Sequence, residues 1–245
     1  MEFSVGLILL GVLIICMFFG VFRRLFDRMN MGIVWVAVAL ITLGVGFAIP
    51  SIVTGAYFAF NIGGAIIANI FAVMLILSLG FNFKMLRAVL ANIAVIGITI
   101  LVLMSIPQHS LGLRILVAFV LGIAAGGISY LTAGTYKGAM FGVIMGILSG
   151  QLITWGINRG IGYASFVNYG GGYIFDAMII GLVFATLTAE LIRMAAVKKS
   201  RMERRHNFAH EQGEDMHFDY TKDPKDFEPH RNFLDKMDDD LHFGD

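Results

Sequence analysis

The sequence predicts an all-α integral membrane protein with about seven transmembrane helices. The chain has 245 residues, of which 58% are hydrophobic and 14% are charged, and its mean hydropathy is +0.79. Soluble domains carry about 25% charged residues, so this chain has too few to cover a surface in water. The charges are also segregated: residues 1–197 hold nine Lys/Arg and four Asp/Glu, whereas residues 198–245 hold nine and thirteen. We therefore expect a polytopic transmembrane domain (1–197) followed by a charged, partly disordered cytoplasmic tail (198–245).

Apolar runs near 20 residues define the expected spans, because only a helix satisfies its own backbone hydrogen bonds in lipid. The count falls to six if one of the shorter runs is re-entrant. The seven runs are Phe3–Phe22, Gly32–Ile49, Gly63–Leu79, Ala88–Ile106, Leu113–Tyr130, Gly138–Ile157 and Tyr173–Val197.

Basic residues set the expected orientation, because cytoplasmic loops are enriched in Lys and Arg. Basic residues follow the first, third, fifth and seventh runs, whereas the opposite side carries only Arg114 and Arg159. This pattern predicts an external N-terminus, a cytoplasmic C-terminus and a location in the plasma membrane.

The two halves of the apolar body resemble each other after a shift of 107 positions. Asn61 then meets Asn168, the pair Gly63 and Gly64 meets Gly170 and Gly171, and Asn69 meets Asp176. The two copies would run parallel, with the fourth span as a linker between two triplets, which is one known transporter plan. Glycine is also common in membrane helices, so composition alone is the alternative explanation.

Asp176 is the acid that lies well inside an apolar run, and two interpretations compete for it. Intramembrane acids usually face the bundle and mark an ion or substrate site. In that case a polar vestibule open to the outside would be lined by Asp176, Asn69, Gln151, Thr154, Arg159, Asn168 and Asn61. Alternatively, Asp176 completes a helix start, where the helix dipole favours a carboxylate by roughly 0.3–1 kcal/mol. The helix-entry glycines on this interpretation are Gly63, Gly64, Gly170, Gly171 and Gly172.

Glu190 is the second acid in the last run, fourteen residues after Asp176. It precedes Arg193 by three positions, a spacing that predicts an ion pair on one helix face. At 1.5 Å per residue the two acids lie about 21 Å apart on one helix. An intramembrane aspartyl protease needs two carboxylates in one site, so this chemistry is the least favoured one. We expect no catalytic residues, no cofactor and no metal site.

Small residues recur at every fourth position in two of the spans. Gly122 and Gly126 lie in the fifth span, and the sixth carries Gly138, Gly142, Gly146 and Gly150. Such stripes predict close helix packing.

The tail starts with a basic segment, Lys198–Arg205, and becomes acidic further on. We expect a helical extension held near anionic headgroups, then spaced phenylalanines that suit docking on a cytoplasmic protein partner. The lipid bilayer is the main partner, a homo-oligomer is compatible with this organisation, and nucleic acid is not expected.

Three segments resemble a known family. They are Phe22–Met29 after the first span, Asn61–Ala65, and Gly171–Ala177 together with Glu190. They are similar to the DUF1614 family of prokaryotic multi-pass membrane proteins, over about residues 5–195. The resemblance implies a membrane architecture, and the family supplies no known reaction.

Two functions remain open from the sequence. The first is a transporter- or channel-like protein for a small solute or ion, with Asp176 as the binding acid. The second is a non-catalytic membrane scaffold or sensor that acts through its cytoplasmic tail.

Overall fold

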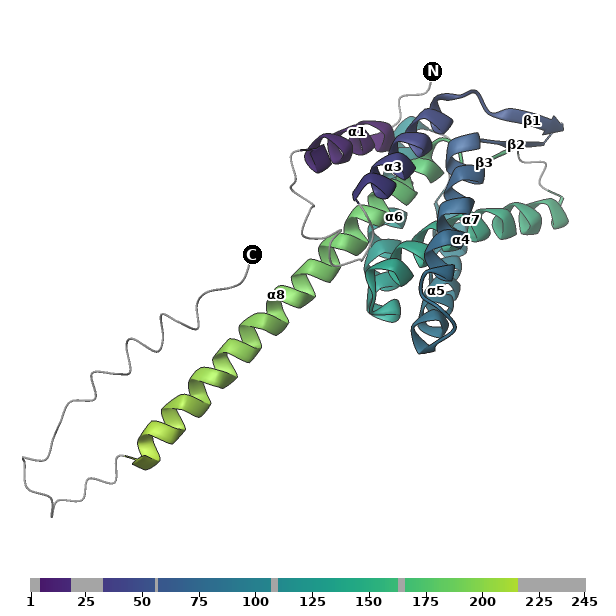
Figure 1. The fold of residues 1–245 in the computed structure, drawn as a ribbon. Coiled ribbons are helices and arrows are strands. Elements are labelled where there is room, and N and C mark those ends of the chain that lie inside the picture. Colours follow the sequence, from purple (N-terminus) through teal and green to yellow (C-terminus); the bar gives the residue numbers. More distant parts are fainter. Residues whose placement is uncertain (1–4, 19–32, 56, 107–109, 163–165, 216–245) are drawn as a thin grey trace, which may run out of the picture. The chain divides into compact units, whose positions relative to one another are not determined.

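The computed structural model describes residues 5–18, 33–55, 57–106, 110–162 and 166–215. Within these ranges the chain forms seven α-helices, one π-helix and three short strands (Figure 1). It divides into two compact units, Met1–Ala195 and Ala196–Asp245. The protein is therefore mostly helical, as the composition predicted.

Each of the seven apolar runs contains a helix. The helix that starts the third run is a π-helix, η1, which passes directly into α4. The elements are α1 (Val5–Phe18), α3 (Ile33–Ala48), η1 (Ile62–Ile67), α4 (Ala68–Leu77), α5 (Phe83–Ser105), α6 (Leu111–Ala133), α7 (Tyr136–Gly160) and α8 (Tyr173–Asp215).

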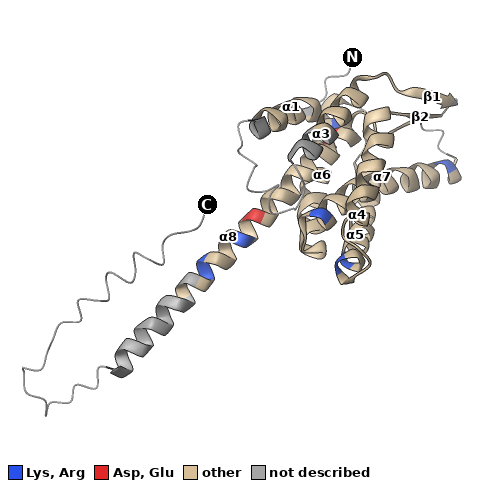
Figure 2. Cartoon of the chain, in the orientation of Figure 1, with Lys and Arg blue, Asp and Glu red and all other residues tan. Residues whose placement is uncertain are grey.

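Four helices are long and apolar enough to cross a membrane. They are α5, α6, α7 and the first part of α8, Tyr173–Ser200, with 23, 23, 25 and 28 residues. The helical segments Gly6–Ile15 and Ile62–Leu77 are apolar but shorter. Figure 2 shows a body almost free of charged residues, as lipid contact requires.

Side-chain caps set where the long helices begin. Asn82, Ser110 and Thr135 precede α5, α6 and α7, and each side chain accepts a hydrogen bond from a backbone N–H of the first turn. These groups have no partner inside the helix, so Asn, Ser and Thr are favoured there. Gly134 ends α6 in the left-handed conformation, at φ 64°, which glycine adopts without a steric cost.

The predicted glycine stripe of α7 packs closely against α5. A Cβ added at Gly146 would lie 2.5 Å from the Val95 side chain, and one at Gly150 would lie 2.5 Å from Thr99. A Cβ added at Gly138 would lie 3.2 Å from the Ala88 Cβ, and one at Gly142 would lie 3.1 Å from the Ala91 Cβ. The small residues let the two backbones approach, which maximises van der Waals contact where no hydrophobic effect acts.

The stripe of α6 packs against α8. A Cβ at Gly122 would lie 2.7 Å from Ile180, and one at Gly126 would meet the Gly181 carbonyl and lie 2.8 Å from the Ala185 nitrogen. Ser129 adds a polar link to α7, because its hydroxyl donates to the Ala139 carbonyl at 2.7 Å. The helices α5 to α8 thus share one tightly packed core.

The expectation of a purely helical fold needs a correction, because described parts of two loops, between the second and third and between the sixth and seventh apolar runs, form a small sheet. Its strands are β1 (Ile52–Gly55), β2 (Phe58–Phe60) and β3 (Val167–Tyr169), in that order. The pair β1–β2 is antiparallel, and β2–β3 is parallel with Ala59 opposite Asn168. β-Branched and aromatic residues favour strands, and pairing satisfies backbone groups that apolar surroundings would leave unpaired.

The last helix is longer than the predicted span. The span was expected to end at Val197, whereas α8 continues to Asp215. The helical extension expected at Lys198–Arg205 is therefore present and runs ten residues further. Residues 198–212 contain no Pro or Gly, so nothing local stops the helix. The disorder expected for the rest of the tail falls largely on residues 216–245, which lie outside the described ranges.

Candidate functional site

The first glycine segment, Asn61–Gly64, is a helix start that the hydrogen bonds of Asn61 hold in place. The Asn61 Oδ1 accepts from the Gly64 N–H at 2.9 Å. Its Nδ2 donates to the Phe47 carbonyl at 3.2 Å, at the carboxyl end of α3. Its backbone N–H donates to the Tyr169 carbonyl at 3.0 Å, which continues the β2–β3 ladder. Asn61 is buried, and both ends of its amide serve the backbone.

The two glycine segments meet each other. A Cβ at Gly64 would collide with the Gly170 carbonyl, and one at Gly170 would collide with the Gly64 backbone. Gly170 also has φ 69°, so it needs glycine for two independent reasons. We call this crossing, with Asn61, Gln151 and Tyr169 around it, the glycine junction.

The other helix-entry glycines support the same arrangement. Gly63, in η1, packs against the backbone of α3, and an added Cβ would collide with the Phe47 nitrogen. Gly171 lies against the Asn168 side chain, and Gly172 has φ 56° just before α8. All five predicted glycines therefore lie where two backbones approach closely or where the chain turns.

Gln151 fastens the second segment from within α7. Its Nε2 donates to the Asn168 carbonyl at 3.0 Å, and its Oε1 accepts from the Gly170 N–H at 3.0 Å. This pair of bonds holds the turn between β3 and α8. Unpaired backbone groups in lipid cost several kcal/mol each, so such a side chain is expected beside an irregular segment. Gln151 is itself buried.

Asp176 is buried and binds the amino end of another helix. Its side chain is 4% exposed, and its Oδ1 accepts from the Gly6 N–H, in the first turn of α1, at 2.8 Å. The Gly6 Cα lies so close that an added Cβ would be 2.6 Å from that oxygen. A carboxylate at a helix amino end satisfies an orphan N–H and complements the helix dipole. Asp176 therefore serves two helix starts, its own in α8 and that of α1.

Asn69 occupies the corresponding position in the first half, with different neighbours. Its Nδ2 donates to the Ala65 carbonyl at 2.7 Å, one turn earlier, and to the Tyr169 hydroxyl at 3.4 Å. Asn69 thus contacts Tyr169 of the glycine junction, whereas Asp176 accepts a hydrogen bond from α1.

Thr154 and Arg159 extend the set along α7. The Thr154 hydroxyl donates to the Gly150 carbonyl of its own helix at 2.8 Å. Arg159 is exposed, and its guanidinium lies 5.9 Å from the Tyr57 ring and 5.5 Å from the Trp155 ring. These distances suit cation–π contacts. Arg159 is thereby engaged by the aromatic residues beside the sheet.

Asn168 retains one unused group. Its carbonyl accepts from Gln151 and from the Gly171 N–H at 3.1 Å, but its side-chain Oδ1 is buried without a hydrogen-bond partner among the described residues. A buried acceptor of this kind costs about 1–3 kcal/mol when nothing binds it.

Glu190 and Arg193 form a cluster of their own. An Arg193 guanidinium nitrogen lies 3.6 Å from Glu190 Oε2, and the Tyr136 hydroxyl donates to Glu190 Oε1 at 2.8 Å. This contact ties the first turn of α7 to α8, away from the glycine junction.

Sequence reasoning missed the partners that give these residues their roles. Gly6, Tyr136 and Tyr169 lie 170, 54 and 100 positions from the side chains that they contact. Nothing local marks Gly6, since many glycines lie in apolar helices. Tyr169 had a usable signal, because it directly follows Asn168, which a shift of 107 positions aligns with Asn61.

The described residues contain no group of three or more His, Cys, Asp or Glu side chains placed to hold a metal ion. Comparison of the chain with family models, with curated proteins and with solved structures finds no match.

Proposed function

We propose that this chain is a non-catalytic multi-pass membrane protein that acts as a scaffold or sensor through its cytoplasmic tail. The observation that carries the proposal is the state of Asp176, whose buried carboxylate accepts from the amino end of α1. The side-chain amides of Asn61 and Gln151 likewise form hydrogen bonds with backbone groups. Polar side chains used in this way stabilise the body of the protein, and the function is assigned to the charged tail that follows it.

The proposal includes an architecture. Seven spans cross the plasma membrane, with the N-terminus outside and the tail in the cytoplasm, and the DUF1614 resemblance reflects this architecture. The short helices α1, α3 and η1–α4 would count as spans beside the four longer helices. The halves would be a parallel repeat, an idea supported by the parallel pairing of β2 with β3. The register is two residues away from the repeat equivalence, because Asn168 lies opposite Ala59 instead of Asn61.

Transport is the second candidate, and the glycine junction favours it. Glycine-interrupted helices at corresponding positions of two halves are the best sequence pointer to a transporter site. The buried, unpartnered Oδ1 of Asn168 beside the junction would be one ligand-facing group. In this candidate a cation or a small polar solute passes the junction, and Asp176 is uncovered when α1 moves.

One set of variants distinguishes the two. Purified protein is reconstituted in vesicles, and proton, sodium and potassium fluxes are compared for wild type, Asp176→Asn and the control Ser105→Ala. In parallel, a chain that ends at residue 205 and the full-length Asp176→Asn variant are each tested for their ability to restore the phenotype of cells from which the protein has been deleted. The scaffold proposal expects no flux above that of empty vesicles, and a phenotype lost only with the tail.

The opposite pattern overturns the scaffold proposal. A wild-type flux that falls at least tenfold in Asp176→Asn but not in Ser105→Ala would establish the transport candidate. A shortened chain that keeps the full phenotype would contradict a role of the tail.

A further inference from the structure

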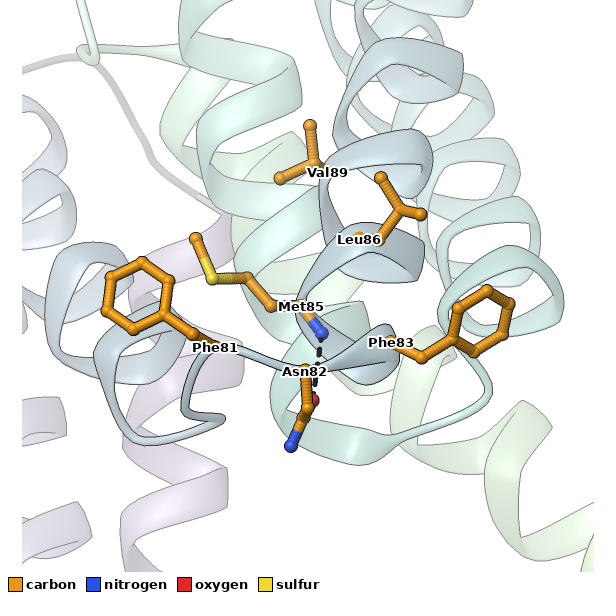
Figure 3. Close-up of a pocket in the computed structure, with 6 residues that line it drawn as sticks. All are labelled: Phe81, Asn82, Phe83, Met85, Leu86 and Val89. Carbon is orange, nitrogen blue, oxygen red and sulfur yellow. Dashed lines mark hydrogen bonds between the residues drawn. The ribbon is translucent and has the colours of Figure 1, made fainter.

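A shallow apolar groove lies at the turn between α4 and α5. Its volume is about 490 Å³, and its lining consists of Phe81, Asn82, Phe83, Met85, Leu86 and Val89. Figure 3 shows the two phenylalanine rings on either side of the α5 start, pointing away from each other, with Met85, Leu86 and Val89 along the helix. Asn82 is the polar residue of the lining. Its side chain caps α5, because its Oδ1 accepts from the Lys84 N–H at 2.9 Å.

The rings that flank the groove are unusually exposed. Phe81 is 93% exposed and Phe83 is 72% exposed. Large apolar side chains gathered at one site mark a surface that contacts lipid or another protein. This site is also the end of the candidate span Phe83–Ser105.

Positive charge surrounds the same end of the bundle. Lys84 is exposed in the first turn of α5. One turn later, Arg87 donates from Nε to the Thr132 carbonyl at 3.0 Å, and its guanidinium covers Gly134 at the α6–α7 turn. Gly138 packs on Ala88, so Lys137 also belongs to this end.

The unit Met1–Ala195 supplies few acids to balance these charges. No Asp or Glu occurs between Asp27 and Asp176. Glu190 contacts this end through Tyr136, but it is already bound by that hydroxyl and by Arg193. A cation in the first turn of a helix also opposes the helix dipole. The position of Lys84 therefore suits an anion from outside the unit Met1–Ala195.

We propose that this groove binds an anionic phospholipid of the adjacent leaflet. The phosphate group is held by the Lys84 ammonium, and one acyl chain lies along Met85, Leu86 and Val89 between the two exposed rings. The inference rests on membrane embedding and is independent of the choice between scaffold and transporter.

The test uses full-length protein in detergent and photoactivatable phosphatidylglycerol or phosphatidylcholine, with the labelled peptides identified by mass spectrometry. We expect phosphatidylglycerol to label residues 81–89, with phosphatidylcholine weaker. A basic residue at a membrane surface contributes about 1 kcal/mol, so Lys84→Gln should reduce the apparent affinity about fivefold. The double variant Phe81→Ala/Phe83→Ala should reduce labelling by both lipids, because it removes apolar contact.

Matched controls lie elsewhere on the molecule. Phe166→Ala removes an exposed ring beside β3, and Arg159→Gln removes an exposed cation at the end of α7. Both should leave the labelling of residues 81–89 unchanged. Equal labelling by the two lipids, or an unchanged affinity of Lys84→Gln, would overturn the proposal.

A second copy of the chain is the competing occupant. Cys16 is the sole cysteine, so Phe81→Cys in a Cys16→Ser background places a single thiol at the groove. We expect this variant to remain uncrosslinked after mild oxidation in vesicles. Efficient formation of disulfide-linked dimers, with a yield that added phosphatidylglycerol does not lower, would assign the groove to a protein interface instead.

Discussion

At the scale of single residues, Asp176 shows how a membrane acid can be structural. Its Oδ1 accepts from Gly6 at the start of α1, while Asp176 itself lies in the first turn of α8. A charged hydrogen bond of this kind is worth about 1.5–3 kcal/mol. The sequence suggested that Asp176 completes a helix start, but it offered only the start of α8. The start of α1 could not be foreseen, because the contact depends on tertiary packing.

The contact predicts opposite effects for two glycines of α1. Gly6→Ala places a Cβ 2.6 Å from Asp176 Oδ1 and 2.8 Å from its Cα, so α1 must shift and the bond is lost. We expect about 2 kcal/mol less stability. Gly11 has nothing within 4 Å of an added Cβ, so Gly11→Ala should stabilise α1 by about 0.5–1 kcal/mol through helix propensity. Thermal unfolding in detergent measures both.

An equal loss of stability in both variants would mean that α1 does not dock on Asp176. Asp176→Asn provides a further comparison, because its Oδ1 can still accept from Gly6. Loss of the charge at the helix amino end should then cost roughly 0.3–1 kcal/mol.

At the scale of elements, glycine stripes decide which helices touch. The stripe of α7 faces α5 and that of α6 faces α8, so each packs against a helix that is not its immediate successor in the chain. The sequence identified the stripes because spacing at every fourth residue is a local signal. It did not identify their partners, because many apolar faces in this chain offer a similar surface.

Two glycines of α7 provide a test within a single helix. Gly146→Ala puts a Cβ 2.5 Å from Val95, whereas Gly156→Ala meets nothing within 4 Å. Overpacking costs about 1–3 kcal/mol, so Gly146→Ala should unfold at a lower temperature than wild type and Gly156→Ala should not. The same unfolding temperature for the two variants would argue that α5 and α7 are not in close contact.

The strands are the element that the sequence missed. The loops between the second and third and between the sixth and seventh apolar runs contribute β1, β2 and β3, whereas the sequence predicted helices alone. The β2–β3 pair joins segments more than 100 positions apart. Such a pairing has no local signature, whereas the runs that became helices could be found from length and hydropathy alone.

At the scale of the whole molecule, the number of spans separates two architectures. Four helices are long and apolar enough to cross a membrane, and the seven-span proposal adds α1, α3 and η1–α4. If only α5 to α8 crossed, the β1–β2 turn and the α4–α5 turn would lie on the same side. With seven spans they lie on opposite sides, because η1–α4 runs between them.

Cysteine accessibility measures this difference. In the Cys16→Ser background, an impermeant maleimide should label Thr54→Cys in intact cells and Phe81→Cys only after permeabilisation. Both positions are exposed. Labelling of both variants in intact cells, or of neither, would support four spans.

The bond between Gly6 and Asp176 also has a consequence for biosynthesis. The two residues are 170 positions apart, and a ribosome adds about 5–20 residues per second. Asp176 is therefore synthesised roughly nine to thirty-four seconds after Gly6. A nascent chain that stalls before the last helix has an α1 whose Gly6 N–H lacks the Asp176 carboxylate. The contact between α1 and α8 can therefore form only after the last helix has been synthesised.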